Sequence, residues 1–179
     1  FAIPSAGFVL HTLNLRLHPS DITYIVNHAE DQVVLVDHVL WPLWEKVAPH
    51  VNVKHVVVMS DGGDLPPGTI DYESLVAPSD EPPFPFLDLD ERSAAAMCYT
   101  SGTTGRPKGV LYSHRSLVLH TLMSISSDGA GIVERDIMLP VVPMFHVNAW
   151  GFPYTCALMG ASQVHPGPHL DPTSLLELM

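Results

Sequence analysis

Positive charge is scarce in this sequence. Eight Lys and Arg stand against 19 Asp and Glu, which gives the 179-residue chain a formal net charge of −11. Proteins that hold nucleic acid neutralise its phosphates with a basic face, so this charge balance excludes a nucleic-acid-binding surface of that kind. Long apolar runs are also missing: none reaches the roughly 18 residues of a membrane helix, which predicts no stable membrane insertion.

Cysteine is rare, and so are terminal signals. The two cysteines, Cys98 and Cys156, lie in apolar runs, which predicts buried thiols rather than a disulfide or a metal site. Such thiols suit a reducing compartment, and we expect a cytoplasmic location. The chain begins at Phe1 rather than at a start methionine and stops within the apolar stretch SLLELM. These ends predict an internal fragment of a larger protein.

Two common nucleotide-binding motifs are absent from the sequence. A Walker A loop needs G-x-x-x-x-G-K-[S/T], but Gly105 is followed by Arg-Pro-Lys-Gly. The G-x-G-x-x-G fingerprint of dinucleotide-binding proteins does not occur either. These absences exclude a P-loop phosphotransferase and argue against a dinucleotide site.

A polar, glycine-rich segment stands out at residues 99–109, which read YTSGTTGRPKG. The apolar run AAAMC before it predicts a short buried strand that ends in a loop. Glycines let backbone N–H groups approach a ligand, hydroxyls can hold a hard cation such as Mg²⁺, and Lys108 supplies a charge for phosphate. Arg106 and Arg115 add positive potential nearby. The segment predicts a polyphosphate loop; a plain polar surface turn is the alternative.

The order of the elements predicts the fold class. Residues 20–30 have the apolar spacing of a helix, 32–37 read as a strand buried on both faces, 39–49 as a helix and 55–59 as a strand. This alternation indicates an α/β protein with a doubly wound, mostly parallel sheet and flanking helices. We divide the chain into a first segment at 1–59, a Pro- and acid-rich connector at 60–92 with one helical turn at 72–76, and a phosphate-loop segment at 93–179.

Regular elements are also expected after the loop. A helix from Ser113 to about Ser126 has Val118, Leu122 and Ile125 on one side, and Ser113 is its expected N-cap. Further expected elements are a strand at 137–142 that Pro140 interrupts, a helix ending near 158, a strand at 160–164 and a helix starting at 171–172.

Three segments together resemble one family. YTSGTTGRPKG resembles the phosphate-loop signature of the adenylate-forming superfamily. VVPMFHVNAWGFPY, residues 141–154, resembles the gate and acyl-pocket motif of medium- and long-chain fatty acyl-CoA synthetases, and residues 7–37 resemble the early Rossmann-like part of those enzymes. The resemblance implies that the chain is part of their large N-terminal domain.

The resemblance also implies an activity. Such an enzyme is an acid–thiol ligase of fatty acid and lipid metabolism: it converts a fatty or related carboxylate into an acyl-adenylate and then into acyl-CoA, releasing pyrophosphate and AMP. ATP, Mg²⁺ and CoA as co-substrate are the implied cofactors, the partners are small molecules, and a homodimer is compatible with the family. Alternatives are an adenylation domain that loads a carrier protein, a luciferase-like oxygenase and a non-catalytic nucleotide-binding regulator.

Site residues follow from the matched motifs. The implied catalytic residues are Lys108 and His146. The implied ligand-binding residues are Thr100, Ser101, Gly102, Thr103, Thr104, Gly105, Lys108, Val147 and Trp150. Thr100 is the implied Mg²⁺ ligand, although a strand-end hydroxyl that bonds the loop backbone is an equal alternative. For His146 and Trp150 the alternatives are a packing histidine and a core aromatic. Asn148 has no role that the sequence supports.

We expect residues 1–179 alone to form no acyl-CoA. By resemblance, the ribose-binding aspartate, the hinge and the C-terminal lysine of the family lie outside this segment. Incubation of the chain with ATP, Mg²⁺, CoA and a fatty acid, followed by chromatography, checks the expectation. Acyl-CoA above the enzyme-free background would contradict it.

Overall fold

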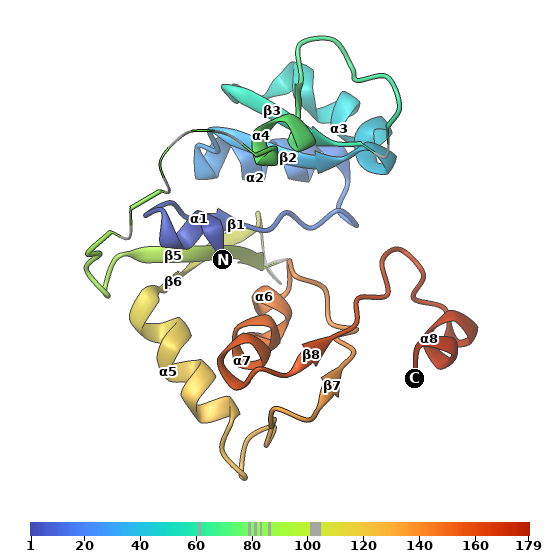
Figure 1. The fold of residues 1–179 in the computed structure, drawn as a ribbon. Helices are drawn as coiled ribbons and strands as arrows, with labels where there is room; N and C mark the ends of the chain where they lie inside the picture. Colours follow the sequence, from blue (N-terminus) through green and yellow to red (C-terminus); the bar gives the residue numbers. More distant parts are fainter. Residues whose placement is uncertain (61, 79, 81, 83, 86, 101–104) are drawn as a thin grey trace. The chain divides into compact units, whose positions relative to one another are not determined.

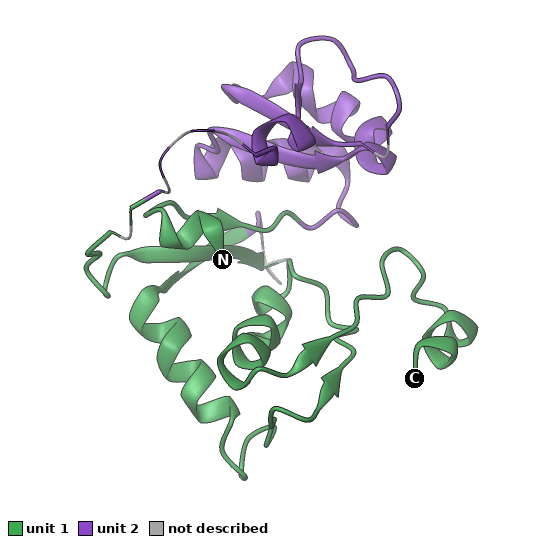
Figure 2. Ribbon diagram, in the orientation of Figure 1, with its two compact units in different colours: residues 1–13, 85–100, 108–179 green, residues 14–84, 101–107 purple. Residues whose placement is uncertain are grey.

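The computed structural model describes residues 1–60, 62–78, 80, 82, 84–85, 87–100 and 105–179. The chain divides into two compact units (Figure 2). Unit 1 comprises residues 1–13, 85–100 and 108–179, and unit 2 comprises residues 14–84 and 101–107. We describe each unit by itself.

Unit 2 is a parallel sheet with helices (Figure 1). Its elements are α2 (Pro19–Ala29), β2 (Val33–Asp37), η1 (His38–Leu40), α3 (Trp41–Val47), η2 (Ala48–His50), β3 (His55–Met59), β4 (Ile70–Asp71) and α4 (Tyr72–Val76). The strand order is β2-β3-β4, and both pairs are parallel. The expected helices and strands are present, including the helical turn at 72–76. The predicted α/β class is confirmed.

Local sequence signals explain where α2 begins and ends. His18 caps the helix by accepting a hydrogen bond from the Ser20 N–H, and Pro19 occupies the first turn, where its missing N–H costs nothing. The helix ends at Glu30, which adopts a left-handed conformation with φ 56°. The buried side chains of unit 2 are Ile22, Ile25, Val26, Val34, Val36, Trp44, Val47, Val57 and Val58. They form an aliphatic core around one tryptophan.

One expectation about the sheet is wrong. Strand β2 was expected to be buried on both faces, but only Val34 and Val36 are buried, whereas Val33 and Leu35 are 48% and 46% exposed. Alternate burial is the pattern of a strand with one covered face. A run of apolar residues does not reveal how many faces will be covered.

Unit 1 is built on a hairpin. Strand β5 (Ala94–Thr100) pairs parallel with β1 (Leu10–His11) and antiparallel with β6 (Lys108–Ser113). The register places Thr100 opposite Lys108 and Ala94 opposite Ser113. The expected buried strand before the polar segment is confirmed. Strand β6 was not expected, and it makes the polar segment the connection of an antiparallel pair.

Helices and a small sheet complete unit 1. They are α1 (Ala2–Ser5), α5 (His114–Ser124), β7 (Ile137–Met138), α6 (Val147–Trp150), α7 (Phe152–Met159), β8 (Ser162–Gln163) and α8 (Pro172–Leu178). Helices α5 and α7 pack side by side, and β7 pairs parallel with β8 (Figure 1). Ser113 caps α5 as expected, by accepting a hydrogen bond from the Ser116 N–H at 3.1 Å. Within the described ranges, no helix is long and apolar enough to cross a membrane.

Two expectations in unit 1 need correction. Val118 and Leu122 were expected on the inward side of α5, but they are 58% and 48% exposed, and Thr121 is its buried residue. The apolar residues of α5 are spread around the helix, so their spacing does not define one inward face. The strand expected at 137–142 ends at Met138, shortly before Pro140, which lacks the N–H that a strand ladder needs.

We predict that the core of unit 2 depends on Ile25. In residues 1–179, Ile25→Ala should lower the free energy of unfolding by about 2–5 kcal/mol, because it leaves a cavity at a side chain that is 1% exposed. Leu35→Ala removes as many carbon atoms from a half-exposed site and should cost clearly less. Urea unfolding of both variants gives the comparison, and equal losses would contradict the assigned core.

Candidate active site

The loop end of the β5–β6 hairpin carries two predicted site residues. Thr100 and Lys108 stand opposite each other in the register, and both are exposed. The Thr100 hydroxyl donates a long hydrogen bond of 3.5 Å to the backbone oxygen of Lys108. This is the backbone contact considered as the alternative to metal binding. A contact of this length is weak, so the hydroxyl can exchange it for another partner.

Part of the predicted loop lies outside the described residues. These positions are Ser101, Gly102, Thr103 and Thr104. Gly105 is described and exposed, and a Cβ added there would have no atom of the other described residues within 4 Å, its chain neighbours aside. The guanidinium carbon of Arg106 lies 4.9 Å from the centre of the Tyr24 ring, which is a cation–π contact within unit 2.

Arg115 does not belong to this end of the hairpin. A strand rises about 3.3 Å per residue, so the Ser113 end of β6 lies roughly 17 Å from Lys108, and Arg115 follows Ser113. Arg115 instead forms an ion pair with Glu91, and its guanidinium holds the pKa of the Glu91 carboxyl below its usual value. The expectation that Arg115 adds positive potential beside the loop is therefore wrong, because β6 carries it to the opposite end.

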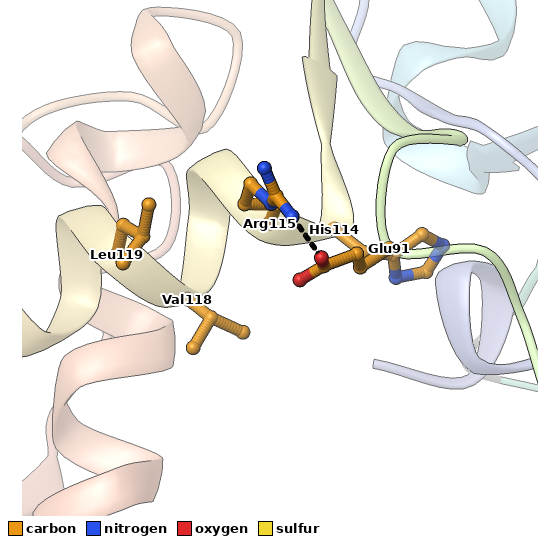
Figure 3. Close-up of a pocket in the computed structure, with 5 residues that line it drawn as sticks. All are labelled: Glu91, His114, Arg115, Val118 and Leu119. Atoms are coloured by element: carbon orange, nitrogen blue, oxygen red, sulfur yellow. Dashed lines mark hydrogen bonds and ion pairs between the residues drawn. The ribbon is translucent and has the colours of Figure 1, made fainter.

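A surface cavity lies around this ion pair. It has a volume of about 370 Å³ and is lined by Glu91, His114, Arg115, Val118 and Leu119 (Figure 3). The dashed contact in Figure 3 shows Arg115 directed at the Glu91 carboxylate. None of these five described residues was a predicted site residue, and α5 carries four of them. The cavity is a feature of the α5 face, separate from the loop end of the hairpin.

The second predicted segment adopts an unusual backbone. Val147, Asn148, Ala149 and Trp150, which form α6, all have positive φ values between 50° and 55°. We call these four residues the left-handed turn. This conformation costs roughly 1–2 kcal/mol per residue for ordinary L-amino acids, and Asn tolerates it better than most. Such strain persists only where surrounding contacts enforce it, and it clusters at functional sites.

Burial divides the left-handed turn into two parts. Asn148 and Ala149 are each 1% exposed, whereas Val147 is 38% and Trp150 is 52% exposed. His146 precedes the turn and is also exposed. The backbone oxygen of His146 accepts a hydrogen bond from the Ala149 N–H at 3.0 Å, and the Asn148 oxygen accepts one from the Gly151 N–H at 3.1 Å. The buried residues Asn148 and Ala149 hold the turn in place, and Val147 and Trp150 expose their side chains to solvent.

A polar cluster joins the turn to the strand that leads into the loop. The Cys98 thiol donates to Oδ1 of Asn148 at 3.3 Å, and the Cys98 Sγ lies 3.4 Å from the Thr12 hydroxyl. Thr12 also donates to the backbone oxygen of Met144 at 2.9 Å. Cys98 lies two residues before Thr100 on β5. The structure therefore brings the end of β5, which leads into the predicted polyphosphate loop, against the predicted gate segment, within unit 1.

Sequence reasoning missed the residues that make this junction. Thr12, Cys98 and Asn148 had no predicted site role. One signal was present in the sequence: Asn and Gly are the residues that most readily take left-handed backbone, and Asn148 lies within this turn while Gly151 follows it. Both cysteines are buried and free, which confirms the predicted core thiols. Burial raises the pKa of the Cys156 thiol, so it stays protonated.

The donor set limits what kind of metal the site could hold. No group of three or more His, Cys, Asp or Glu capable of holding a metal occurs among the residues that the structure describes. A transition-metal centre of protein ligands therefore has no support there. Mg²⁺ differs, because it keeps several waters, takes substrate phosphate oxygens and needs as few as one or two protein ligands. The exposed Thr100 hydroxyl beside Lys108 fits such a site.

Comparison with known proteins shows the family of the chain. The family described as AMP-binding enzyme matches residues 1–179. A long-chain-fatty-acid–CoA ligase of Thermus thermophilus is 52% identical over 99% of this chain and 32% of its own length. A 3-methylmercaptopropionyl-CoA ligase of Ruegeria pomeroyi is 48% identical over all of this chain and 34% of its own length. The chain thus spans about a third of the length of these relatives.

A solved structure supports the fold. The luciferase-like enzyme of the mealworm Zophobas morio superposes with a TM-score of 0.80 at 21% identity. The match covers 96% of this chain and 39% of that one.

We predict that Gly151, which follows the left-handed turn, resists substitution for two reasons. Its φ is 71°, and a Cβ added there would lie 2.8 Å from Nδ1 of His120. Gly151→Ala should destabilise the chain by more than the roughly 1–3 kcal/mol of backbone strain alone.

Gly167→Ala is the matched control, because Gly167 has φ 59° and, chain neighbours aside, no atom of the described part of the chain lies within 4 Å of an added Cβ. In the double variant Gly151→Ala/His120→Ala, the loss in free energy of unfolding should fall to the loss seen for Gly167→Ala. Chemical unfolding measures all three, and equal losses for the two single variants would refute the contact with His120.

Proposed function

Because the chain belongs to the AMP-binding enzyme family, we propose that the full-length protein activates a carboxylic acid with ATP and transfers the acyl group to CoA. In the first step, a carboxylate oxygen attacks the α-phosphorus of ATP; an acyl-adenylate forms and pyrophosphate leaves. In the second, the CoA thiol attacks the acyl carbonyl; a thioester forms and AMP leaves. The protein would be an acid–thiol ligase.

The observation that carries this proposal is the identity to two CoA ligases across the whole chain. The names of these ligases give a long-chain fatty acid and 3-methylmercaptopropionate as their acids. We therefore propose a fatty or related carboxylic acid as substrate. The contact between the gate segment and the end of β5, which leads into the predicted polyphosphate loop, supports this proposal, since the reaction must bring the carboxylate to the α-phosphate.

The hairpin end provides groups for the triphosphate. Negative charge spreads over the phosphates during adenylyl transfer, so donors and cations aimed at them stabilise the transition state. We propose that Lys108 supplies a positive charge there and that Thr100 contributes its hydroxyl to Mg²⁺. When bound, Mg²⁺ neutralises phosphate charge. Ser101, Gly102, Thr103, Thr104 and Gly105 remain predicted phosphate contacts.

The left-handed turn provides groups for the acid. We propose that His146 positions the carboxylate, that Trp150 gates the acyl site and that Val147 lines it. All three are partly or fully exposed. An exposed imidazole and a half-exposed indole are free to contact a ligand, which a fully packed pair would not be.

Further proposals concern the metabolic role, the location, the oligomeric state and the domain division of the protein. We propose a role in fatty acid and lipid metabolism, which rests on the named relatives. A cytoplasmic location is supported by the two free thiols, Cys98 and Cys156. A homodimer rests on the family resemblance alone. The division at residues 1–59, 60–92 and 93–179 remains a prediction.

An ATP–pyrophosphate exchange screen of the full-length protein over a panel of carboxylic acids tests the function. Exchange should require the acid and Mg²⁺, and CoA should convert the adenylate into a thioester. Exchange without thioester formation would favour carrier-protein loading. No exchange with any acid would favour a nucleotide-binding regulator.

We predict that Lys108→Ala in the full-length protein lowers acid-dependent exchange by about 10²-fold or more, because a preorganised charge is lost from the developing transition state. Lys46→Ala removes an exposed lysine from α3 and should leave exchange unchanged. Thermal unfolding of both variants separates folding from chemistry. A loss of exchange that merely follows a loss of folded protein would contradict the role of Lys108.

A further inference from the structure

Asn148 is a buried polar residue in a strained turn, and the proposed reaction gives it no role. Its side chain is 1% exposed, and its Oδ1 accepts from the Cys98 thiol. Its Nδ2 is sealed from solvent and has no hydrogen-bond partner among the described residues. A buried amide with one unsatisfied donor is costly, and native proteins rarely keep such a group without a reason.

Burial rules out one role for this amide. Because Nδ2 is sealed, Asn148 cannot donate directly to a substrate while the turn has this conformation. It can act only through the residues that it holds. Asn148 and Ala149 form the inner part of the left-handed turn, and the outer part presents Val147 and Trp150 directly after the exposed His146.

The anchor of the turn is a thiol on the central strand. Cys98 lies on β5, two residues before Thr100, so the contact from its Sγ to Asn148 fixes the turn relative to that strand. Thr12 completes the cluster by contacting Cys98 and holding the backbone oxygen of Met144, two residues before His146. The turn is thereby tied at its inner residue and just before its start.

We propose that Asn148 is a positioning residue for the acid substrate, acting through the Cys98 contact to hold His146 and Trp150 in place. The inference rests on the proposed function. It assigns to Asn148 and Cys98 a role in carboxylate use and none in ATP binding, because the Cys98 thiol contacts Asn148 and Thr12, whereas the proposed ATP groups at Thr100 and Lys108 contact each other. Asn suits this position because it tolerates left-handed backbone and also offers an acceptor.

Four variants of the full-length protein separate the anchor from the backbone effect. Asn148→Gly keeps the left-handed conformation accessible but removes the amide. Cys98→Ala removes the thiol donor, and Cys98→Ser retains a donor of similar size. Cys156→Ala removes a thiol that is buried in α7 and packs in the core cluster with Ile132 and Ala161, so it reports the general cost of losing a core thiol.

We expect the variants to change KM for the carboxylate much more than KM for ATP. In acid-dependent exchange, Asn148→Gly and Cys98→Ala should each raise KM for the carboxylate by about tenfold, the size of one lost buried hydrogen bond. KM for ATP should stay within about threefold in both. Cys98→Ser should restore the carboxylate KM, and the double variant Asn148→Gly/Cys98→Ala should be no worse than either single variant, because both break one contact.

Several outcomes would overturn the proposal. They are equal rises in the two KM values, a carboxylate KM that Cys156→Ala raises as much as Cys98→Ala does, and additive effects in the double variant. A lower thermal midpoint with both KM values unchanged would make Asn148 merely structural.

A second readout does not depend on activity. Asn148→Gly should speed the reaction of Cys98 with a thiol reagent by about tenfold or more, with Cys98 identified by its loss in the double variant. If the wild-type protein shows no exchange with any acid, the proposed function fails, and the thiol rate still decides whether Asn148 holds the turn against Cys98. An unchanged rate would refute that contact.

Discussion

The antiparallel pairing of β5 with β6 is the constraint on which the candidate site depends. It places Thr100 opposite Lys108, so both ends of the polar segment are fixed to one hairpin before any ligand is present. Fixing the ends of a loop removes much of the conformational freedom that a ligand would otherwise have to remove. The same strand carries Cys98, whose contact with Asn148 sets the position of the left-handed turn. Strand β5 therefore helps to position both the proposed triphosphate site and the proposed acid site.

The left-handed turn shows how packing can enforce a backbone that the sequence alone disfavours. Ordinary residues such as Val147 and Trp150 take positive φ because their inner neighbours Asn148 and Ala149 are packed away from solvent. The result is a short element that exposes its outer side chains on a fixed base. A regular helix through the same residues would have placed His146 and Trp150 differently relative to β5.

Positive charge around the polar loop is less concentrated than the sequence suggests. Arg106 lies over the Tyr24 ring, and Arg115 is paired with Glu91 at the far end of β6. Lys108 remains at the loop end of the hairpin. Stabilisation of a polyphosphate at this place would therefore depend on Lys108, on backbone N–H groups and on a bound cation, rather than on a cluster of basic side chains.

The sequence by itself determined the α/β class, the helix α2, the helix α5 with its Ser113 cap, the strand before the polar loop, the buried thiols and the family, because these depend on local periodicity, capping residues and an unbroken motif. The N-cap of α2 is His18, whereas the sequence predicted Ser20 and Asp21. Tertiary structure alone decided which face of β2 is covered, where β6 carries Arg115, and that Thr12, Cys98 and Asn148 meet. Those outcomes join residues far apart in the chain, and local sequence patterns do not encode such contacts.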